Sequence, residues 1–204
     1  MIDFLEEGHI YLKDGIITPS VSEVLHFIFP DKYKGIPEWI LERKAEYGTK
    51  VHKAIEILEE TGEVIELNTY QELSLEQYLK LKEKYNIEVL EQEKIVSYEY
   101  DYCGRFDMIA KIGNDNCLCD IKTTAELDKE YVSWQLSFYE LAYGKNFDKL
   151  YAIWLPKGDL GQLVEIKRKN KEELLNKLKE FKNMIKTDEY YGGTYPEPHE
   201  VIDC

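Results

Sequence analysis

The sequence has few cysteines, and none is spaced as a metal site requires. There is no Cys-x-x-Cys pair and no histidine close to the four thiols, which are Cys103, Cys117, Cys119 and Cys204. Zinc and iron–sulfur sites need several thiolates that converge on one point. We therefore expect reduced, partly buried thiols and no iron–sulfur cluster.

Long apolar runs and an export signal are also missing. No stretch approaches the roughly 20 apolar residues of a membrane-spanning helix. The amino terminus lacks the basic and then apolar layout of a signal peptide. These absences predict a cytoplasmic location and no membrane partner.

Positive charge is scarce, because 26 lysines and arginines face 40 acidic residues and leave a formal charge of −14. Proteins that coat nucleic acid gain most of their affinity by neutralising phosphates, so the sequence disfavours that class. The charge does not exclude an enzyme that binds DNA at one local site through its basic residues. The alternative is that these residues belong to solvated helix faces. The basic clusters are Lys32 with Lys34, Arg43 and Lys44 with Lys50 and Lys53, and Lys177, Lys179, Lys182 and Lys186.

The residues that are present predict one globular domain over residues 1–204. Hydrophobic residues make up 44% of the chain, and there are no repeats and no proline- or serine-rich linker. The predicted order is helix, strand, strand, strand, helix, strand, strand, helix, with residues 63–92 as a helical insertion that leads to the sheet. This order favours the α/β or α+β class, with a mixed central β-sheet flanked by helices.

A β-hairpin is predicted over residues 102–122, and it carries the most informative side chains. Residues 113–116 tolerate the positive φ of a tight turn, and a four-residue loop there would place Asp107 opposite Lys122. Because side chains alternate with period two, Asp120 and Lys122 share one face, roughly 7 Å apart. Two carboxylates and one ammonium are therefore expected on a single patch.

These charges suggest chemistry, because a core has no packing reason to gather them. Mg²⁺ and similar hard cations bind through one or two carboxylates plus substrate phosphate. A lysine beside such a metal can orient a water and offset phosphate charge. The alternative is a surface ribbon with a solvated cross-strand ion pair.

Two helices carry further candidates. His52 and Glu56 form an i, i+4 row beside the apolar stripe of the helix that starts near Pro37. Gln135 and Tyr139 form a similar row on the helix that follows the hairpin. Each row is also compatible with an ordinary packed or half-exposed helix face.

Four sequence blocks together resemble the PD-(D/E)XK nuclease superfamily, in the branch of RecB-like and phage exonucleases. The blocks are Pro-Ser-Val-Ser at residues 19–22, residues 48–52, Gly-Arg-Phe-Asp at 104–107 with Asp-Ile-Lys-Thr at 120–123, and residues 135–139. They follow the family's order and cover most of the chain. The resemblance implies a restriction-endonuclease-like core. One departure is that the second acid is Asp120 and not a glutamate.

The resemblance also implies roles for individual residues. Lys122 would be catalytic together with Asp107 and Asp120, and the metal, Mg²⁺ or Mn²⁺, would be held by both carboxylates, His52 and the Ile121 carbonyl. Substrate would contact Thr123, Gln135 and Tyr139. Glu56 and Glu93 are weaker candidates for the metal site.

The function expected from this resemblance is a metal-dependent exonuclease acting on DNA ends in recombination or repair, with a phage as its source. A structure-specific or restriction-type endonuclease is one alternative, and a nuclease-fold protein that binds DNA without cutting it is another. DNA is the expected partner, together with a recombinase or single-strand-binding protein. The oligomeric state stays open.

Overall fold

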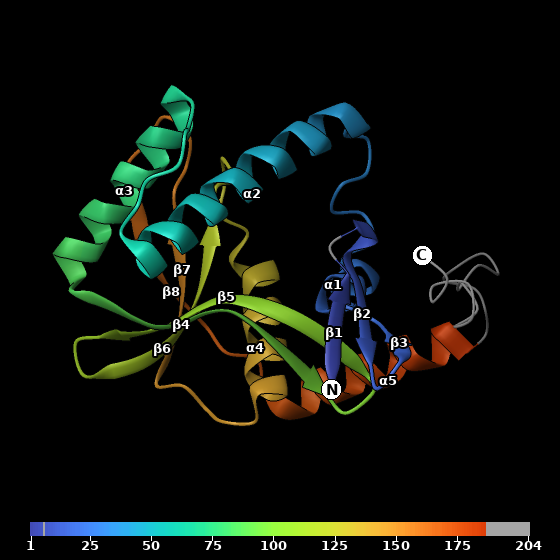
Figure 1. The fold of residues 1–204 in the computed structure, drawn as a ribbon. Coiled ribbons are helices and arrows are strands. Elements are labelled where there is room, and N and C mark those ends of the chain that lie inside the picture. The colour runs from blue at the N-terminus through green and yellow to red at the C-terminus, as the bar shows by residue number, and fades with distance from the viewer. Residues whose placement is uncertain (6, 187–204) are drawn as a thin grey trace.

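The computed structural model describes residues 1–5 and 7–186, and its centre is a five-stranded mixed sheet (Figure 1). The strands lie in the order β4 (Ile87–Tyr98), β5 (Tyr102–Ile112), β6 (Asp115–Lys122), β7 (Lys149–Trp154) and β8 (Gln162–Ile166). Only β6 and β7 are parallel, because the helix between them returns the chain to the same end of the sheet. The predicted fold class is confirmed.

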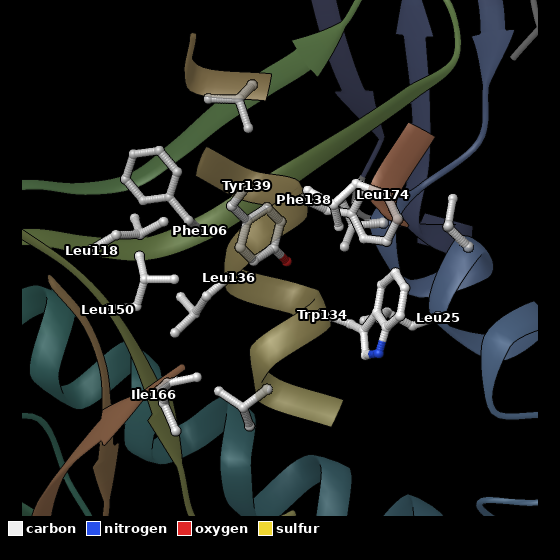
Figure 2. Packing of buried hydrophobic residues seen from close by; sticks show 14 of the residues in the cluster. Leu25, Phe106, Leu118, Trp134, Leu136, Phe138, Tyr139, Leu150, Ile166 and Leu174 are labelled. Carbon is white, nitrogen blue, oxygen red and sulfur yellow. The ribbon is translucent and has the colours of Figure 1, made fainter. Parts of the chain in front are cut away.

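Helices cover both faces of this sheet. One apolar cluster joins it to α2 (Glu38–Thr61) and α3 (Thr69–Tyr85). The other joins it to α1 (Val21–Ile28), α4 (Lys129–Tyr143) and α5 (Lys171–Lys186). Figure 2 shows α4 inside the second cluster, with Leu136 toward the strand residue Leu118 and Trp134 beside Leu25 of α1.

Local signals place the helix ends. Ser20 caps α1 through a capping box, in which its hydroxyl accepts from the Glu23 N–H and the Glu23 carboxylate accepts from the Ser20 N–H. Gly62, at φ 77°, ends α2 in the left-handed conformation that glycine adopts most readily. Of the two serines in the block at residues 19–22, Ser20 is therefore the one that begins this helix.

A small second sheet precedes α1. It lies beside the end of β4 and the start of β5 (Figure 1). It consists of β1 (Ile2–Leu5), β2 (Ile10–Lys13) and β3 (Ile16–Thr18), with a short 3₁₀ turn at Glu7–His9. The Pro19 carbonyl accepts a 2.7 Å hydrogen bond from Cys103 N, and Ser20 pairs with Cys103 as an isolated bridge. The first sequence block is thereby joined to the start of β5.

Two details of the predicted sheet are wrong. The turn between β5 and β6 has two residues, Gly113 and Asn114, so Ile112 pairs with Asp115 and every predicted partner moves by two positions. Gly113 has φ 64°, which suits the first position of such a turn. A shift of two preserves the alternation of faces, so the error changes which residues lie opposite but leaves the side of the sheet unchanged.

The second correction concerns residues 63–92. The helical part ends at Tyr85, and β4 begins at Ile87, so residues 87–92 belong to the central sheet and not to an insertion. Asn86, at φ 49°, caps α3 and turns the chain into the strand. The alternation of Ile87 and Val89 with acidic residues is a strand pattern within a segment whose composition favours helix.

Of the helices in the part of the chain described here, none has both the length and the apolar character that a membrane crossing requires. Cys103, Cys117 and Cys119 are buried free thiols, and Cys204 lies outside the described residues. Lys186, the last member of a predicted basic cluster, ends α5.

Candidate metal and catalytic site

The four sequence blocks meet around β5. Tyr139 of α4 and Val21 of α1 pack against the backbone of Gly104, where an added Cβ would lie 2.6 Å from Tyr139 Cε1 and 2.9 Å from Val21 Cγ2. His52 of α2 approaches the other end of the same block, with Nδ1 3.4 Å from Asp107 Oδ1. Glycine at 104 is therefore a packing requirement, since any side chain there would displace α1 or α4.

Asp107 is held at the point where the β5–β6 ladder ends. Backbone pairing stops at Met108 and Cys119, and beyond it Asp107 Oδ2 accepts a 2.6 Å hydrogen bond from Ile121 N. Burial works to raise the pKa of Asp107, but the imidazole of His52, the Lys122 ammonium and this N–H lower it overall. The carboxylate is thus kept ionised within the protein.

A pocket of about 310 Å³ opens over this point. His52 and Asp107 line it, together with Glu93 of β4. The candidate ligand atoms of these three residues lie within 4.8 Å of one another, and we call this group the metal cluster. Three oxygen- or nitrogen-bearing side chains from α2, β4 and β5 therefore converge on one open space.

Glu93 of the metal cluster has an unusual backbone conformation. Its φ is 46°, in the left-handed region that glutamate rarely occupies, at a cost of about 1–2 kcal/mol. Burial and the charge of Asp107 raise the pKa of Glu93 to about 7, despite the Arg105 guanidinium 2.9 Å away. Strained residues of this kind concentrate at functional sites.

Asp120 and Lys122 form a second group, which we call the amine pair. Lys122 Nζ lies 2.7 Å from Asp120 Oδ2, yet in an orientation that makes no hydrogen bond, so this buried oxygen has none among the described residues. Burial and the charge of Asp107 raise the pKa of Asp120 to about 6, although Lys122 lowers it. Burial lowers the pKa of Lys122, but both aspartates raise it overall.

The remaining predicted residues lie around these two groups. Gln135 Nε2 donates to the Tyr139 hydroxyl at 3.5 Å, while Gln135 Oε1 is buried without a hydrogen bond to any described residue. Glu56 lines the pocket, but its carboxylate is paired with Lys53 at 2.9 Å. Thr123 faces a separate groove and approaches Gly48, whose added Cβ would lie 3.3 Å from Thr123 Oγ1.

The structure brings together His52, Asp107, Asp120 and Lys122, and it adds Glu93 more firmly than the sequence alone suggested. Ile121 is present through its N–H, whereas the expected role of its carbonyl stays a prediction. Arg105, the partner of Glu93, received no role from the sequence. Its position two residues before Asp107 on a strand is the signal that would have placed both on one face.

In sequence, this chain matches no protein-family model and no curated protein. Solved structures resemble it over most of its length. The alkaline exonuclease LHK-Exo from Laribacter hongkongensis has a TM-score of 0.45 and 13% identity, covering 85% of this chain and 90% of that one. A phage-related exonuclease from Haemophilus somnus 129PT has a TM-score of 0.40 and 14% identity, covering 85% and 93%. SSO0001 has a TM-score of 0.42 and 19% identity, covering 82% and 76%.

Proposed function

We propose that this chain is a metal-dependent deoxyribonuclease that hydrolyses phosphodiester bonds at DNA ends. The observation that carries the proposal is the convergence of the metal cluster and the amine pair around Asp107. Two of the structures named above are exonucleases, and the four sequence blocks resemble the same class.

The residues fit a hard divalent cation. The metal cluster offers two carboxylates and one imidazole, and Asp120 adds a buried oxygen that lacks a hydrogen bond from any described group. Carboxylate-rich sets of this kind suit Mg²⁺ or Mn²⁺, while the buried Cys117 and Cys119 belong to the packed face and not to the cluster. We propose His52, Glu93, Asp107 and Asp120 as the groups that would hold the ion.

When bound, such an ion would polarise a phosphate oxygen and lower the pKa of a coordinated water. The chain's own residues then have separate tasks. Asp107, kept ionised by His52 and by the Ile121 N–H, offers a fixed negative oxygen to the pocket. His52 Nδ1 faces this carboxylate, which orients the imidazole ring.

Lys122 acts as a charge and not as a base. Because Asp120 and Asp107 raise its pKa, the amine is protonated at neutral pH. A protonated amine can donate hydrogen bonds to a water or to a phosphate oxygen, and it stabilises the negative charge that builds up as the phosphodiester bond breaks. Asp120 holds this amine at 2.7 Å and is its positioning partner.

The finer proposal is an exonuclease of recombination or repair, of the RecB-like and phage-encoded kind, in one domain. It follows from the sequence blocks and not from any single contact. Gln135, Tyr139 and Thr123 would contact or support the substrate strand, and a recombinase or single-strand-binding protein would be its partner. Host cytoplasm is the compartment that this proposal implies.

Two DNA forms test the proposal. The protein is incubated with end-labelled linear DNA and with covalently closed circular DNA, in Mg²⁺ or Mn²⁺. Loss of the linear form alone supports an exonuclease, and cutting of the circles supports the endonuclease alternative. No cutting of either form in both metals would overturn the enzyme proposal and leave a binding protein.

A matched pair of variants assigns the activity to this site. Lys122→Ala removes the proposed amine, and Lys111→Ala removes an exposed lysine from the neighbouring strand of the same hairpin. Activity that vanishes only in Lys122→Ala supports the assignment. Equal activity in both variants would contradict it.

A further inference from the structure

A groove of about 770 Å³ runs along the amino-terminal half of α2, outside the pocket of the metal cluster. The start of α3 and the loops after β6 and β7 form its other wall. Because β6 and β7 are parallel, the loops that follow them both leave the sheet at the carboxyl ends of these strands. We call it the α2 groove, and the residues that matter here are Trp39, Arg43, Lys44, Lys50, Tyr70 and Lys157.

The α2 groove is basic on an acidic molecule. Four cationic side chains line it, Glu46 is the one acidic residue in its lining, and the whole chain has a formal charge of −14. Within residues 1–5 and 7–186, none of Arg43, Lys44, Lys50 and Lys157 forms an ion pair or hydrogen bond. The groove therefore offers uncompensated positive charge to an anion.

Other lysines of the basic clusters differ in this respect, and one of them, Lys53, belongs to the same cluster as Arg43. Lys53 is paired with Glu56, Lys177 with Glu180 and Lys182 with Asp101. An internal carboxylate already neutralises these cations, so they add little attraction for an external phosphate. Arg43, Lys44 and Lys50, on the first half of α2, instead keep their charge available along one groove.

Aromatic rings stand beside these cations. The side chain of Trp39 is 57% exposed and that of Tyr70 is 52% exposed, which is unusual for rings of this size. Lys157 Nζ lies 3.7 Å from the centroid of the Tyr70 ring, and the Tyr47 hydroxyl donates to the Tyr70 carbonyl at 2.8 Å. Lys157 thus lies against the Tyr70 ring, Tyr47 holds the Tyr70 backbone, and half of the residue stays exposed.

The groove leads to the amine pair. Thr123, the residue after Lys122, lines it, and α2 crosses Thr123 at Gly48, four residues before His52. From Trp39 to His52 the helix rises about 20 Å. The groove and the pocket of the metal cluster lie along different sides of α2, so a strand along this length would pass Thr123 and turn past Gly48 to reach the metal cluster.

We infer that the α2 groove binds single-stranded DNA and guides it to the metal cluster, an inference that rests on the proposed nuclease function. Exposed rings can stack only on bases that are not already stacked and paired, as they are in a duplex, while the cations contact the phosphates. A basic groove interleaved with aromatic rings is therefore selective for a single strand over a duplex.

Binding without cleavage tests this inference directly. A fluorescently labelled 12-nucleotide oligothymidine and a duplex of the same length are titrated with the full chain in EDTA, and anisotropy is followed. We expect the single strand to bind more tightly, and Trp39→Ala or Tyr70→Ala to weaken single-strand binding about tenfold each. Tyr100→Ala is the matched control, because Tyr100 is a 54% exposed tyrosine at the turn between β4 and β5.

The salt dependence of binding gives a second readout. Arg43→Ala should lower the slope of log affinity against log salt by roughly one phosphate contact, whereas the control Lys177→Ala, which removes an ion-paired cation, should leave the slope unchanged. Circular dichroism and thermal unfolding show whether each variant is folded. Trp39 and Arg43 are exposed, so their removal leaves the core intact.

The outcomes separate the two proposals. Weaker single-strand binding in the groove variants supports the inference even if no DNA is cut with metal, a result that would overturn the nuclease proposal alone. Single-strand affinity within twofold of the unaltered chain in both ring variants would overturn the inference, whatever the cleavage assay shows. Equal affinity for the duplex, or no measurable binding of the single strand, would overturn it as well.

Discussion

The metal cluster and the amine pair lie side by side, yet they are built in different ways. His52, Glu93 and Asp107 come from three separate elements and face an open pocket. Asp120 and Lys122 come from a single strand, and Asp120 is only 2% exposed. One group offers ligand atoms to the solvent, and the other is an ion pair held inside the sheet.

The two aspartates show what this difference does. His52 and the Ile121 N–H overcome burial and lower the pKa of Asp107, whereas burial prevails at Asp120 and raises its pKa to about 6. The side chains are chemically identical, so the contrast arises from their neighbours. Asp107 is suited to hold an ion, and Asp120 is suited to position an amine as well as to offer its buried oxygen to the ion.

The largest expected effect comes from removing one group and sparing the other. Lys122→Ala should lower kcat at saturating Mn²⁺ by about 10²–10⁴-fold, because the amine stabilises charge that develops only during the reaction. The affinity for Mn²⁺, measured by titration calorimetry, should stay within a few fold, since the metal cluster is untouched. A large loss of metal affinity in this variant would show that the two groups do not have separate tasks.

The pH dependence of stability sharpens the comparison. Glu93 and Asp120 have raised pKa values of about 7 and about 6, so the folded metal-free chain holds protons that the unfolded chain has already released. The free energy of unfolding in EDTA should therefore fall between pH 5 and pH 7.5, on the order of 3 kcal/mol. His52, whose pKa is raised mainly by Asp107 against the effect of burial, contributes in the same direction, because its stabilisation is lost as pH rises through that value.

Urea unfolding at the two pH values measures this change. Asp107 adds nothing to the slope in this window, because its lowered pKa leaves it ionised in both states throughout. Glu93→Gln should flatten the slope, and excess Mn²⁺ at pH 7.5 should restore stability by binding the folded form. Stability that rises with pH in EDTA would contradict the ionisation states described here.

The smallest effect is expected for Tyr139, which supports the metal cluster and the amine pair from α4. Tyr139→Phe removes the hydroxyl that Gln135 approaches at 3.5 Å but keeps the ring that packs on Gly104. Such a long hydrogen bond contributes little, so we expect less than about 1 kcal/mol in stability and a change in kcat below about threefold. A loss of kcat as large as that in Lys122→Ala would mean that the hydroxyl contacts the reacting groups.

Local sequence patterns predicted much of the fold. Residue type allowed either Ser20 or Ser22 as a helix cap, of which the structure uses Ser20, and Asp120 and Lys122 were placed on one face because a strand alternates with period two. The register of the hairpin was wrong because two residues, Gly113 and Asn114, make the turn that four residues were expected to make. Residue type indicates that a turn exists better than it indicates the length of the turn.

Other features depend on contacts that no local pattern contains. Glu93 is a ligand candidate because the pairing of β4 with β5 brings it close to Asp107, which no local pattern indicates. Tyr70 and Lys157 are 87 positions apart and meet only when α3 and the loop after β7 are packed together. The sequence therefore identified the amine pair more securely than the metal cluster, which needs three distant segments.

The unbroken course of α2 has one more consequence. A glycine such as Gly48 usually weakens a helix by roughly 1 kcal/mol. The helix α2 nevertheless continues from Glu38 to Thr61 without a break. Trp39 and His52 therefore belong to one continuous helix. A displacement of α2 at Trp39 would also displace the imidazole of His52.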